Sequence, residues 1–206
     1  MKIRHFVDSQ KVLIWLFMLL MMAGYRQSGN ATAWIYLALH GSYGVLWVIK
    51  SHYFPDRQWE SPTNWIFGIA IWIGLCLYML PGWLITSRGL QAPAWWMGIC
   101  VVMYIFGVFI QFASDMQKTT TLKLRPNQLI TDGLWSLSRN PNYFGELLIY
   151  GGFSLLARHW LPLFVLSAWV VFVWYPKMRQ KDRSLSRYPD FAGYKAKTKL
   201  FIPFIF

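Results

Sequence analysis

Six stretches of this 206-residue chain combine the length of a membrane-spanning helix with an almost complete lack of charged side chains. A hydrocarbon core of about 30 Å is crossed by roughly 20 mostly apolar helical residues. The stretches are Val12–Tyr25, Ala33–Ile49, Trp65–Ile85, Ala94–Ala113, Tyr143–Ala157 and Trp160–Pro176. We therefore predict an all-α fold, a polytopic membrane helix bundle of about six transmembrane helices. The first and fifth stretches are short, so their ends must include flanking residues or the helices must tilt less. Six spans fit best, and counts of five or seven remain open.

Composition separates this prediction from a soluble helical protein. Only 14% of the residues are charged and 56% are hydrophobic, whereas soluble domains carry about 25% charged residues. Too little polar surface remains to cover an apolar core of this size. The first stretch follows a basic N-terminus, as the apolar part of a secretion signal does. No small-residue cleavage site follows Met21 and Met22, so we expect a retained first span.

The distribution of Lys and Arg predicts the orientation. With six spans and a cytosolic N-terminus, seventeen of the twenty Lys and Arg residues fall on the cytosolic side, and only Arg26, Arg88 and Arg158 fall outside. Cytosolic loops carry such an excess of basic residues. We expect both termini in the cytosol, in a bacterial inner membrane or an ER-type membrane. Topology and contact with membrane lipids explain the net charge of +12, and no motif indicates a nucleic-acid partner.

Two segments depart from the pattern of spans joined by short turns. The connection Ser114–Asn142 and the tail Lys177–Phe206 are both long, polar and basic, and long connections usually carry function or disorder. Both fall on the predicted cytosolic side. The tail ends in the apolar segment Phe201–Phe206, which we expect to fold the basic residues back over the bundle. The prediction is a single integral membrane domain, residues 1–206, with a cytosolic polar cap.

The densest polar cluster lies between Gly133 and the start of the fifth stretch. Asn142 can cap the helix that begins there, and Glu146 lies one turn inside it. A carboxylate entering the membrane is costly and usually faces a cavity or a partner. Arg139, Asn142 and Glu146 are spaced so that they could converge on one polar ligand. The alternative is a capped helix with a local pair between Arg139 and Glu146.

Two further groups contain candidate functional residues. Gln111 and Asp115 share a helix face at i, i+4, with Lys118 beside them, although an ordinary interfacial helix end has the same pattern. In the second stretch, His40 and Tyr43 are i, i+3 neighbours. They form either a hydrogen-bonded core pair or a catalytic proton donor, since both side chains are suitable acids.

Several motifs of the C-terminal half resemble one family. They are Ser-Asp at 114–115, Gly-Leu-Trp at 133–135, Ser-Arg-Asn-Pro-Asn-Tyr-Phe-Gly-Glu at 138–146 and Ile-Pro-Phe-Ile-Phe at 202–206. Together they resemble the steroid 5α-reductase family and its bacterial relatives over residues 107–206. The N-terminal spans, residues 1–106, match only by hydropathy and by the pair of His40 and Tyr43. The resemblance implies reduction of a carbon–carbon double bond conjugated to a carbonyl, with NADPH bound by residues 107–206 at the cytosolic side.

The resemblance also implies roles for particular residues. Gln111 and Asp115 match positions near the adenosine and ribose of the cofactor, and Arg179 matches a basic tail residue that helps to hold it. This sequence departs from the family at three positions. The family has a His and a Tyr in the tail, and these positions fall near Arg183 and Arg187 here. The family commonly has Asn at the position of Gln111. The full predicted cofactor-binding set is Gln111, Asp115, Lys118, Arg139, Asn142, Tyr143, Glu146, Arg179 and Arg183. The catalytic candidates are Tyr43, as the acid that polarises the carbonyl of a lipophilic substrate from the bilayer, and Glu146.

Two alternatives remain open at this stage. Membrane methyltransferases resembling isoprenylcysteine carboxyl methyltransferase share the C-terminal plan and hold S-adenosylmethionine where the reductases hold NADPH. Their Arg-His-Pro is replaced here by Arg-Asn-Pro at 139–141, and their paired tail glutamates by Lys181 and Asp182, which disfavours methyl transfer. The third possibility is a non-catalytic membrane scaffold. Cys76 and Cys100 have no His or Cys neighbour at ligand spacing, so no metal site is expected.

Overall fold

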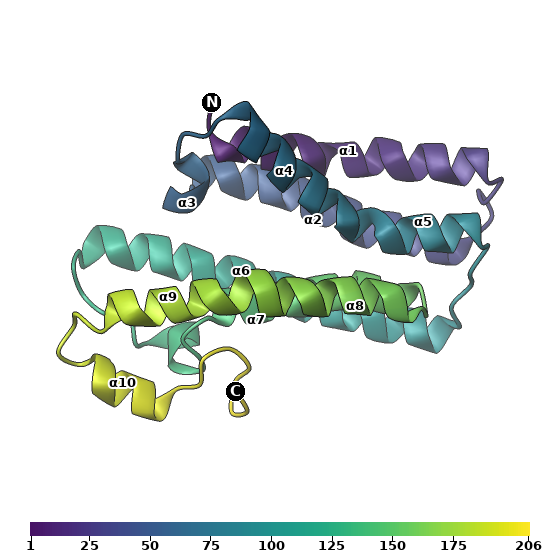
Figure 1. The fold of residues 1–206 in the computed structure, drawn as a ribbon. Helices are drawn as coiled ribbons and strands as arrows, with labels where there is room; N and C mark the ends of the chain where they lie inside the picture. The colour runs from purple at the N-terminus through teal and green to yellow at the C-terminus, as the bar shows by residue number, and fades with distance from the viewer. The chain divides into compact units, whose positions relative to one another are not determined.

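The computed structural model describes all residues 1–206 and consists of helices joined by turns and loops, without a β-sheet (Figure 1). The elements in chain order are α1 (Ile3–Gly24), α2 (Ala31–Tyr53), α3 (Arg57–Glu60), α4 (Trp65–Cys76), η1 (Leu77–Met79), α5 (Leu80–Ser87), α6 (Ala94–Leu124), η2 (Gly133–Ser136), α7 (Pro141–Leu156), α8 (Trp160–Trp169), η3 (Val170–Trp174), α9 (Tyr175–Leu185) and α10 (Phe191–Lys197).

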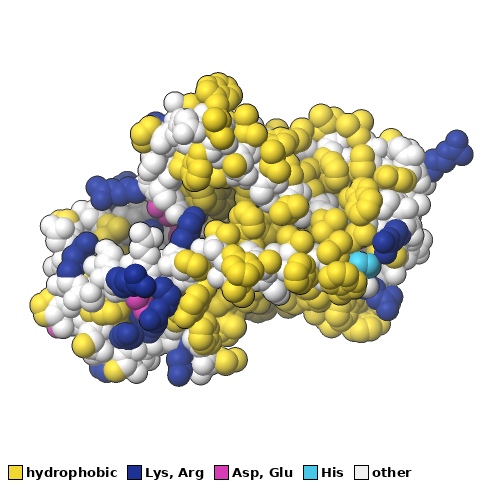
Figure 2. Space-filling model, in the orientation of Figure 1, with side chains coloured by type: hydrophobic (Ala, Val, Ile, Leu, Met, Phe, Trp, Pro, Cys, Tyr) yellow, Lys and Arg dark blue, Asp and Glu magenta, His cyan; other side chains and the backbone are white.

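Five continuous helical runs are long and apolar enough to cross a membrane. They are Ile3–Gly24, Ala31–Tyr53, Trp65–Ser87, Ala94–Leu124 and Trp160–Leu185. The remaining predicted stretch forms α7, which has 16 residues and is therefore about 24 Å long, somewhat shorter than the hydrocarbon core. The prediction of an all-α polytopic membrane protein is confirmed, with five long helical runs and one shorter helix. Apolar side chains cover much of the visible surface, as expected for contact with lipid (Figure 2).

The helices divide into two compact units, and the first comprises Met1–Tyr104 and Tyr150–Leu166. Within it, α1 and α2 run antiparallel and side by side (Figure 1). A Cβ atom at Gly44 of α2 would lie 2.6 Å from the carbonyl oxygen of Lys11 of α1. Only glycine permits this approach, since small residues let membrane helices pack backbone to backbone. Lys11, assigned from sequence to the cytosolic N-terminus, is thereby buried with 1% of its surface exposed.

The third apolar run is interrupted at its middle. Helix α4 ends at Cys76, one tight 3₁₀ turn follows, and α5 begins at Leu80 with Pro81 in its first turn. Proline has no N–H group and removes one helical hydrogen bond. The hydroxyl of Tyr36 donates to the Tyr78 carbonyl at 3.0 Å, so a side chain from α2 supplies a partner at the interruption.

The second unit comprises Ile105–Ile149 and Ser167–Phe206. Its first two helical segments, from α6 and α7, cross at two glycines. A Cβ atom at Gly107 would lie 2.7 Å from the Gly145 carbonyl oxygen, and one at Gly145 would lie 2.5 Å from the Gln111 backbone nitrogen. This close crossing brings the side chains that flank Gly145 against those of α6.

Replacing Gly145 with alanine is expected to push α6 and α7 apart, because the new Cβ meets rigid backbone. Overpacking of this kind destabilises a protein by on the order of 1 kcal/mol or more. Gly98 on α6 is the matched control, because a Cβ there meets nothing within 4 Å and alanine favours the helix. Thermal unfolding in detergent should show a lower midpoint for Gly145→Ala than for Gly98→Ala. Equal midpoints would contradict the close crossing.

The last apolar run contains a π-helical turn just before its polar C-terminal part. One π-helical turn, Val170–Trp174, separates α8 from α9, and such turns occur often at functional sites. Trp174 is buried there, with its ring centroid 5.5 Å from that of Tyr143 and 6.4 Å from that of Phe201. The π turn thus lies where α7 and the C-terminal tail meet α9.

The tail folds back onto the second unit through part of its apolar end. Leu200 and Phe201 are buried, whereas Phe204, Ile205 and Phe206 are exposed. Hydrogen bonds from the Phe201 amide to the Phe206 carbonyl (2.7 Å) and from the Phe206 amide to the Ile202 carbonyl (3.0 Å) curl the terminus on itself. The side chains of Phe204, Ile205 and Phe206 therefore form an apolar patch at the surface.

Candidate cofactor-binding site

The candidate site of the second unit begins at the crossing of α6 and α7. The side-chain amide of Gln111 donates to Glu146 Oε1 at 2.8 Å, and Gln111 is fully buried. Asp115, 6% exposed, follows one turn later on the same face of α6, with buried Ser114 beside it. The structure therefore brings together Gln111 and Glu146, two of the residues predicted from sequence, through the glycine crossing.

Asn142 presents an unsatisfied acceptor in this region. Its Oδ1 atom is buried and has no hydrogen-bond partner in the protein, and the hydroxyl of Ser138 is likewise without one. Asn142 and Glu146 lie one turn apart on α7. Leaving a buried acceptor unpaired costs about 1–3 kcal/mol, so such a group calls for an explanation. A donor on a bound ligand would supply the missing hydrogen bond.

The loop that precedes α7 is held against α6 by Gln117. Its side chain donates to the Asp132 carbonyl at 2.9 Å and accepts from the Leu134 amide at 3.1 Å. Gly133 between them has φ +57°, which glycine adopts without steric cost. The Arg125 guanidinium donates to the exposed Asp132 carboxylate at 2.8 Å, and this hydrogen bond lowers the pKa of that carboxyl. The Gly-Leu-Trp motif is thus a turn fastened to α6.

Arg139 binds the C-terminal tail. Its Nε atom donates to both carboxylate oxygens of Asp182 at 3.0 and 3.2 Å, and its Nη1 atom donates to the Thr198 carbonyl. Arg139 is 5% and Asp182 6% exposed, so the ion pair is buried. The partner of Arg139 is therefore a tail aspartate, where the sequence suggested a ligand or Glu146, and Arg139 positions the loop.

Further side chains connect the same loop to the tail. Lys181 donates to the Arg139 carbonyl at 2.8 Å and lies 4.2 Å from the centre of the Trp135 ring. The hydroxyl of Tyr194 donates to the Trp135 carbonyl at 2.6 Å, and burial raises the pKa of that hydroxyl, so Tyr194 remains a donor at neutral pH. Asn140 donates to the Leu200 carbonyl at 2.8 Å. The tail is thus latched to the residues that precede α7.

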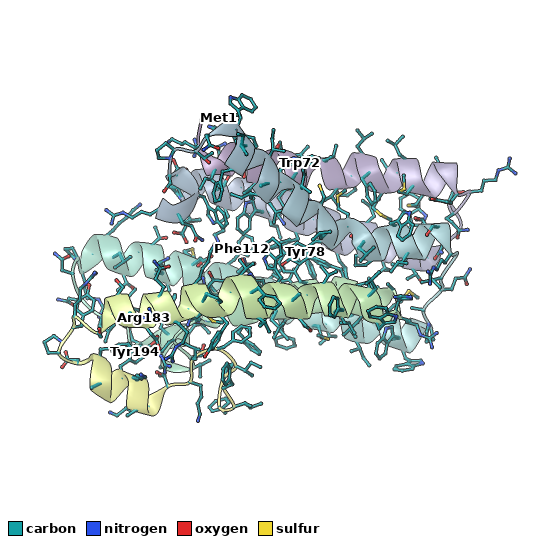
Figure 3. All side chains as sticks on the ribbon, viewed as in Figure 1. Met1, Trp72, Tyr78, Phe112, Arg183 and Tyr194 are labelled. Atoms are coloured by element: carbon teal, nitrogen blue, oxygen red, sulfur yellow. The ribbon has the colours of Figure 1, made fainter.

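Exposed and partly exposed cationic side chains also occur on α9 and α6 of this unit. Arg179 and Arg183 are exposed and lie one turn apart on α9, and Lys118 of α6 is partly exposed. Figure 2 shows Lys and Arg side chains gathered over α9 and α10, and Figure 3 shows Arg183 and Tyr194 in this part of the unit. Exposed guanidinium groups can bind phosphate in a bidentate manner.

The two remaining predicted tyrosines belong to different units, Tyr143 to the second and Tyr43 to the first. Tyr143 contacts the Trp174 ring, as described above. Tyr43 belongs to the first unit, where its ring lies 5.6 Å from that of Tyr150 and 4.8 Å from Lys11 Nζ. His40 hydrogen-bonds Tyr36 at 2.7 Å, so the core pair expected for His40 exists, with Tyr36 as the partner in place of Tyr43.

Sequence reasoning missed three residues that the structure makes prominent. Lys11 was counted with the cytosolic basic residues, although an ionisable residue next to an apolar run is by default a functional candidate. Asp182 was noted only as a departure from a glutamate pair. Tyr150 carries no signal of its own in the sequence, since tyrosine is common in membrane helices.

The second unit contains side chains of the kinds that bind sugars and phosphates. The carboxylates of Asp115 and Glu146 suit sugar hydroxyls, and the exposed Arg179 and Arg183 suit phosphates. The unpaired Asn142 Oδ1 suits an amide or hydroxyl donor. Donors, acceptors and cations of the required kinds therefore occur in this unit.

A family profile described as "Protein of unknown function (DUF1295)" matches residues 12–198. The search of curated proteins finds no match. The matched range includes every residue of the candidate site.

Proposed function

This chain belongs to the DUF1295 family of membrane proteins of unknown function, and we propose that it is an NADPH-dependent reductase. The proposed reaction reduces a carbon–carbon double bond conjugated to a carbonyl in a steroid-like or other lipophilic substrate. The observation that carries the proposal is the part-buried hydrogen bond between Gln111 and Glu146, with the unsatisfied Asn142 Oδ1 one turn away on α7. These residues lie in the segment that resembles the steroid 5α-reductases.

In this proposal the second unit holds the cofactor. Asp115 and Glu146 accept hydrogen bonds from ribose hydroxyls, and Asn142 accepts one from a donor of the cofactor. Arg179 and Arg183 bind phosphate, and an Arg near the ribose favours the 2′-phosphate that distinguishes NADPH from NADH. Arg139 keeps the loop and the tail together around these groups through Asp182.

NADPH supplies a hydride when it is bound. The chain must then orient the cofactor, exclude water and stabilise the negative charge that develops on the substrate oxygen. Stabilisation of such charge by preorganised donors is usually the largest contribution to catalysis. A substrate drawn from the bilayer enters without first crossing water, which suits a protein with so much apolar surface.

We also propose that both termini face the cytosol. The basic residues of α9, α10 and the loop after α6 would then lie on the side where NADPH is available and where basic residues are enriched in membrane proteins. The same residues would contact anionic lipid headgroups.

Titration of the detergent-solubilised protein with NADPH, NADH and S-adenosylmethionine tests the proposal. A ligand that binds only the folded state at a concentration of 100 Kd stabilises it by about 2.7 kcal/mol. We expect NADPH to raise the unfolding midpoint, NADH to do so less, and S-adenosylmethionine to have no effect. The double variant Arg179→Gln, Arg183→Gln should bring the NADPH response down to that of NADH. The control Arg26→Gln, Arg158→Gln, which removes two basic residues from the predicted opposite side, should leave it unchanged.

The other outcomes are equally decisive. Stabilisation by S-adenosylmethionine alone would overturn the reductase and favour a membrane methyltransferase. Stabilisation by none of the three would favour a non-catalytic scaffold.

A further inference from the structure

The first unit buries a lysine within an aromatic cage. Lys11 Nζ lies 4.8 Å from the centre of the Tyr43 ring, 5.6 Å from that of Trp47 and 5.3 Å from that of Tyr150. Lys11 is 1% exposed and follows two full turns of α1. An ammonium group inside a membrane span is costly, and such residues usually mark a functional site. Attraction between the cation and three ring faces offsets part of that cost.

The ammonium group is hydrogen-bonded within the cage. Lys11 Nζ donates to the Tyr150 hydroxyl at 3.0 Å. The Tyr150 ring is held by stacking on Tyr78, with centroids 4.0 Å apart, and by an edge contact with Phe153 at 5.4 Å. The hydroxyl of Tyr150 is thus fixed in position beside a positive charge, which stabilises negative charge on its oxygen or on an atom bound to it.

Two buried polar atoms of the same cluster lack hydrogen-bond partners. They are the indole N–H of Trp47 and Nε2 of His40. The His40 ring stacks on Phe153 at 4.5 Å, and Phe153 also contacts Tyr43 and Tyr150. Buried groups without partners are rare in soluble proteins and still more costly in a membrane. A polar group of a ligand would supply the missing hydrogen bonds.

We propose that Tyr150 is the acid that binds the carbonyl oxygen of the lipophilic substrate, with Lys11 as the positioning residue that stabilises the charge formed there. This inference rests on the proposed reductase function and names the residue that binds the substrate oxygen in its reaction. It assigns the role of the acid to Tyr150, whose hydroxyl accepts the ammonium hydrogen bond at 3.0 Å. Tyr43 contributes a face of the cage around Lys11.

The step balances as a reduction by two electrons. The β-carbon of the enone gains a hydride, and the electron pair of the carbon–carbon double bond moves to give an enolate. The enolate oxygen takes the hydroxyl proton of Tyr150, whose oxygen keeps the electron pair beside the Lys11 ammonium. Return of the enol to the ketone places a proton on the α-carbon, and a proton from solvent restores Tyr150.

Reduction kinetics in proteoliposomes with a steroid 4-en-3-one as the probe test the acid. General acids contribute about 10²–10⁴-fold, so Tyr150→Phe is expected to lower kcat at least about a hundredfold while KM changes little. Lys11→Met should lower kcat about tenfold, and Lys11→Arg should recover part of it. Tyr104→Phe is the matched control, because it also removes a largely buried tyrosine hydroxyl, one bonded to Ser42 at 2.8 Å. It should retain the wild-type rate.

Infrared spectroscopy of the bound probe gives a readout that does not depend on turnover. With ¹³C at the carbonyl carbon, the C=O stretch should be lower in frequency on the wild-type protein than in detergent alone. The stretch should return toward the detergent value in Tyr150→Phe and stay lowered in Tyr104→Phe. Circular dichroism confirms that each variant is folded.

The outcomes separate the two proposals. Absence of NADPH-dependent reduction by the wild-type protein contradicts the reductase assignment for this probe. A carbonyl stretch that is lowered on the wild type and restored by Tyr150→Phe still supports the oxygen-binding site. An unshifted stretch on the wild type, or a folded Tyr150→Phe protein with wild-type kcat and stretch, overturns the role of Tyr150.

Discussion

Replacing Arg139 with methionine is expected to release the C-terminal tail and to lower the free energy of its local opening by about 3–5 kcal/mol. The substitution removes one partner of a buried ion pair and leaves the Asp182 carboxylate, 6% exposed, without its guanidinium. It also removes the donor to the Thr198 carbonyl. Hydrogen–deuterium exchange of residues 191–206 measures this opening, because local unfolding controls the exchange of protected amides. A loss of about 3 kcal/mol corresponds to more than a hundredfold faster exchange.

Two further variants separate the buried pair from a general effect of charge. Arg125→Met breaks an exposed pair, in which Arg125 and Asp132 have side chains 50% and 55% exposed, and exposed pairs contribute about 0–1 kcal/mol. It should leave exchange in the tail unchanged. The double variant Arg139→Met, Asp182→Leu removes both charges and should recover much of the protection, because apolar replacement of a buried pair is often neutral. Unchanged exchange in Arg139→Met would contradict the conclusion that Arg139 holds the tail in place.

Glu146→Gln is expected to weaken cofactor binding by on the order of 2 kcal/mol, roughly thirtyfold, while the protein remains folded. The carboxylate accepts a part-buried hydrogen bond at 2.8 Å from the side chain of Gln111, which is itself fully buried. Loss of a charge-assisted hydrogen bond to a ribose hydroxyl accounts for the expected change. If Glu146 served only the helix end, the substitution would cost about 0.3–1 kcal/mol of stability and would leave cofactor affinity intact.

Calorimetric titration with NADPH distinguishes these two results. The matched control is Glu60→Gln, which makes the same chemical change at a carboxylate that binds Lys2 at 2.6 Å and Arg4 at 2.9 Å in the first unit. Its NADPH affinity should equal that of the wild type. A Glu146→Gln protein with wild-type affinity would remove Glu146 from the cofactor site.

The helix bounds in the structure show which helix ends can be predicted from the apolar pattern of the sequence and which cannot. The first stretch was predicted to begin at Val12, but α1 begins at Ile3, because its polar first turns carry buried Phe6, Val7 and Gln10 on the inward face. In the same way α6 continues past Ala113 to Leu124. Polar residues end an apolar pattern without ending a helix, since the helix continues wherever one face still packs.

The candidate site likewise has features that the sequence predicts and features that it does not. The i, i+4 spacing of Asn142 and Glu146 follows from their place at the start of one helix and could be predicted. The pairing of Gln111 with Glu146 could not, because it depends on the crossing at Gly107 and Gly145, which brings two separate helices into contact.

Sequence alone determined the class of protein, because the transfer of apolar residues into lipid adds up residue by residue along each stretch and needs no knowledge of neighbours. Only the tertiary structure decided which charges act together. Lys11 meets Tyr150 and Arg139 meets Asp182 across long separations in the chain. The energy of a buried charge depends on the distance to its partner and on the exclusion of water, and both are properties of the packed helices.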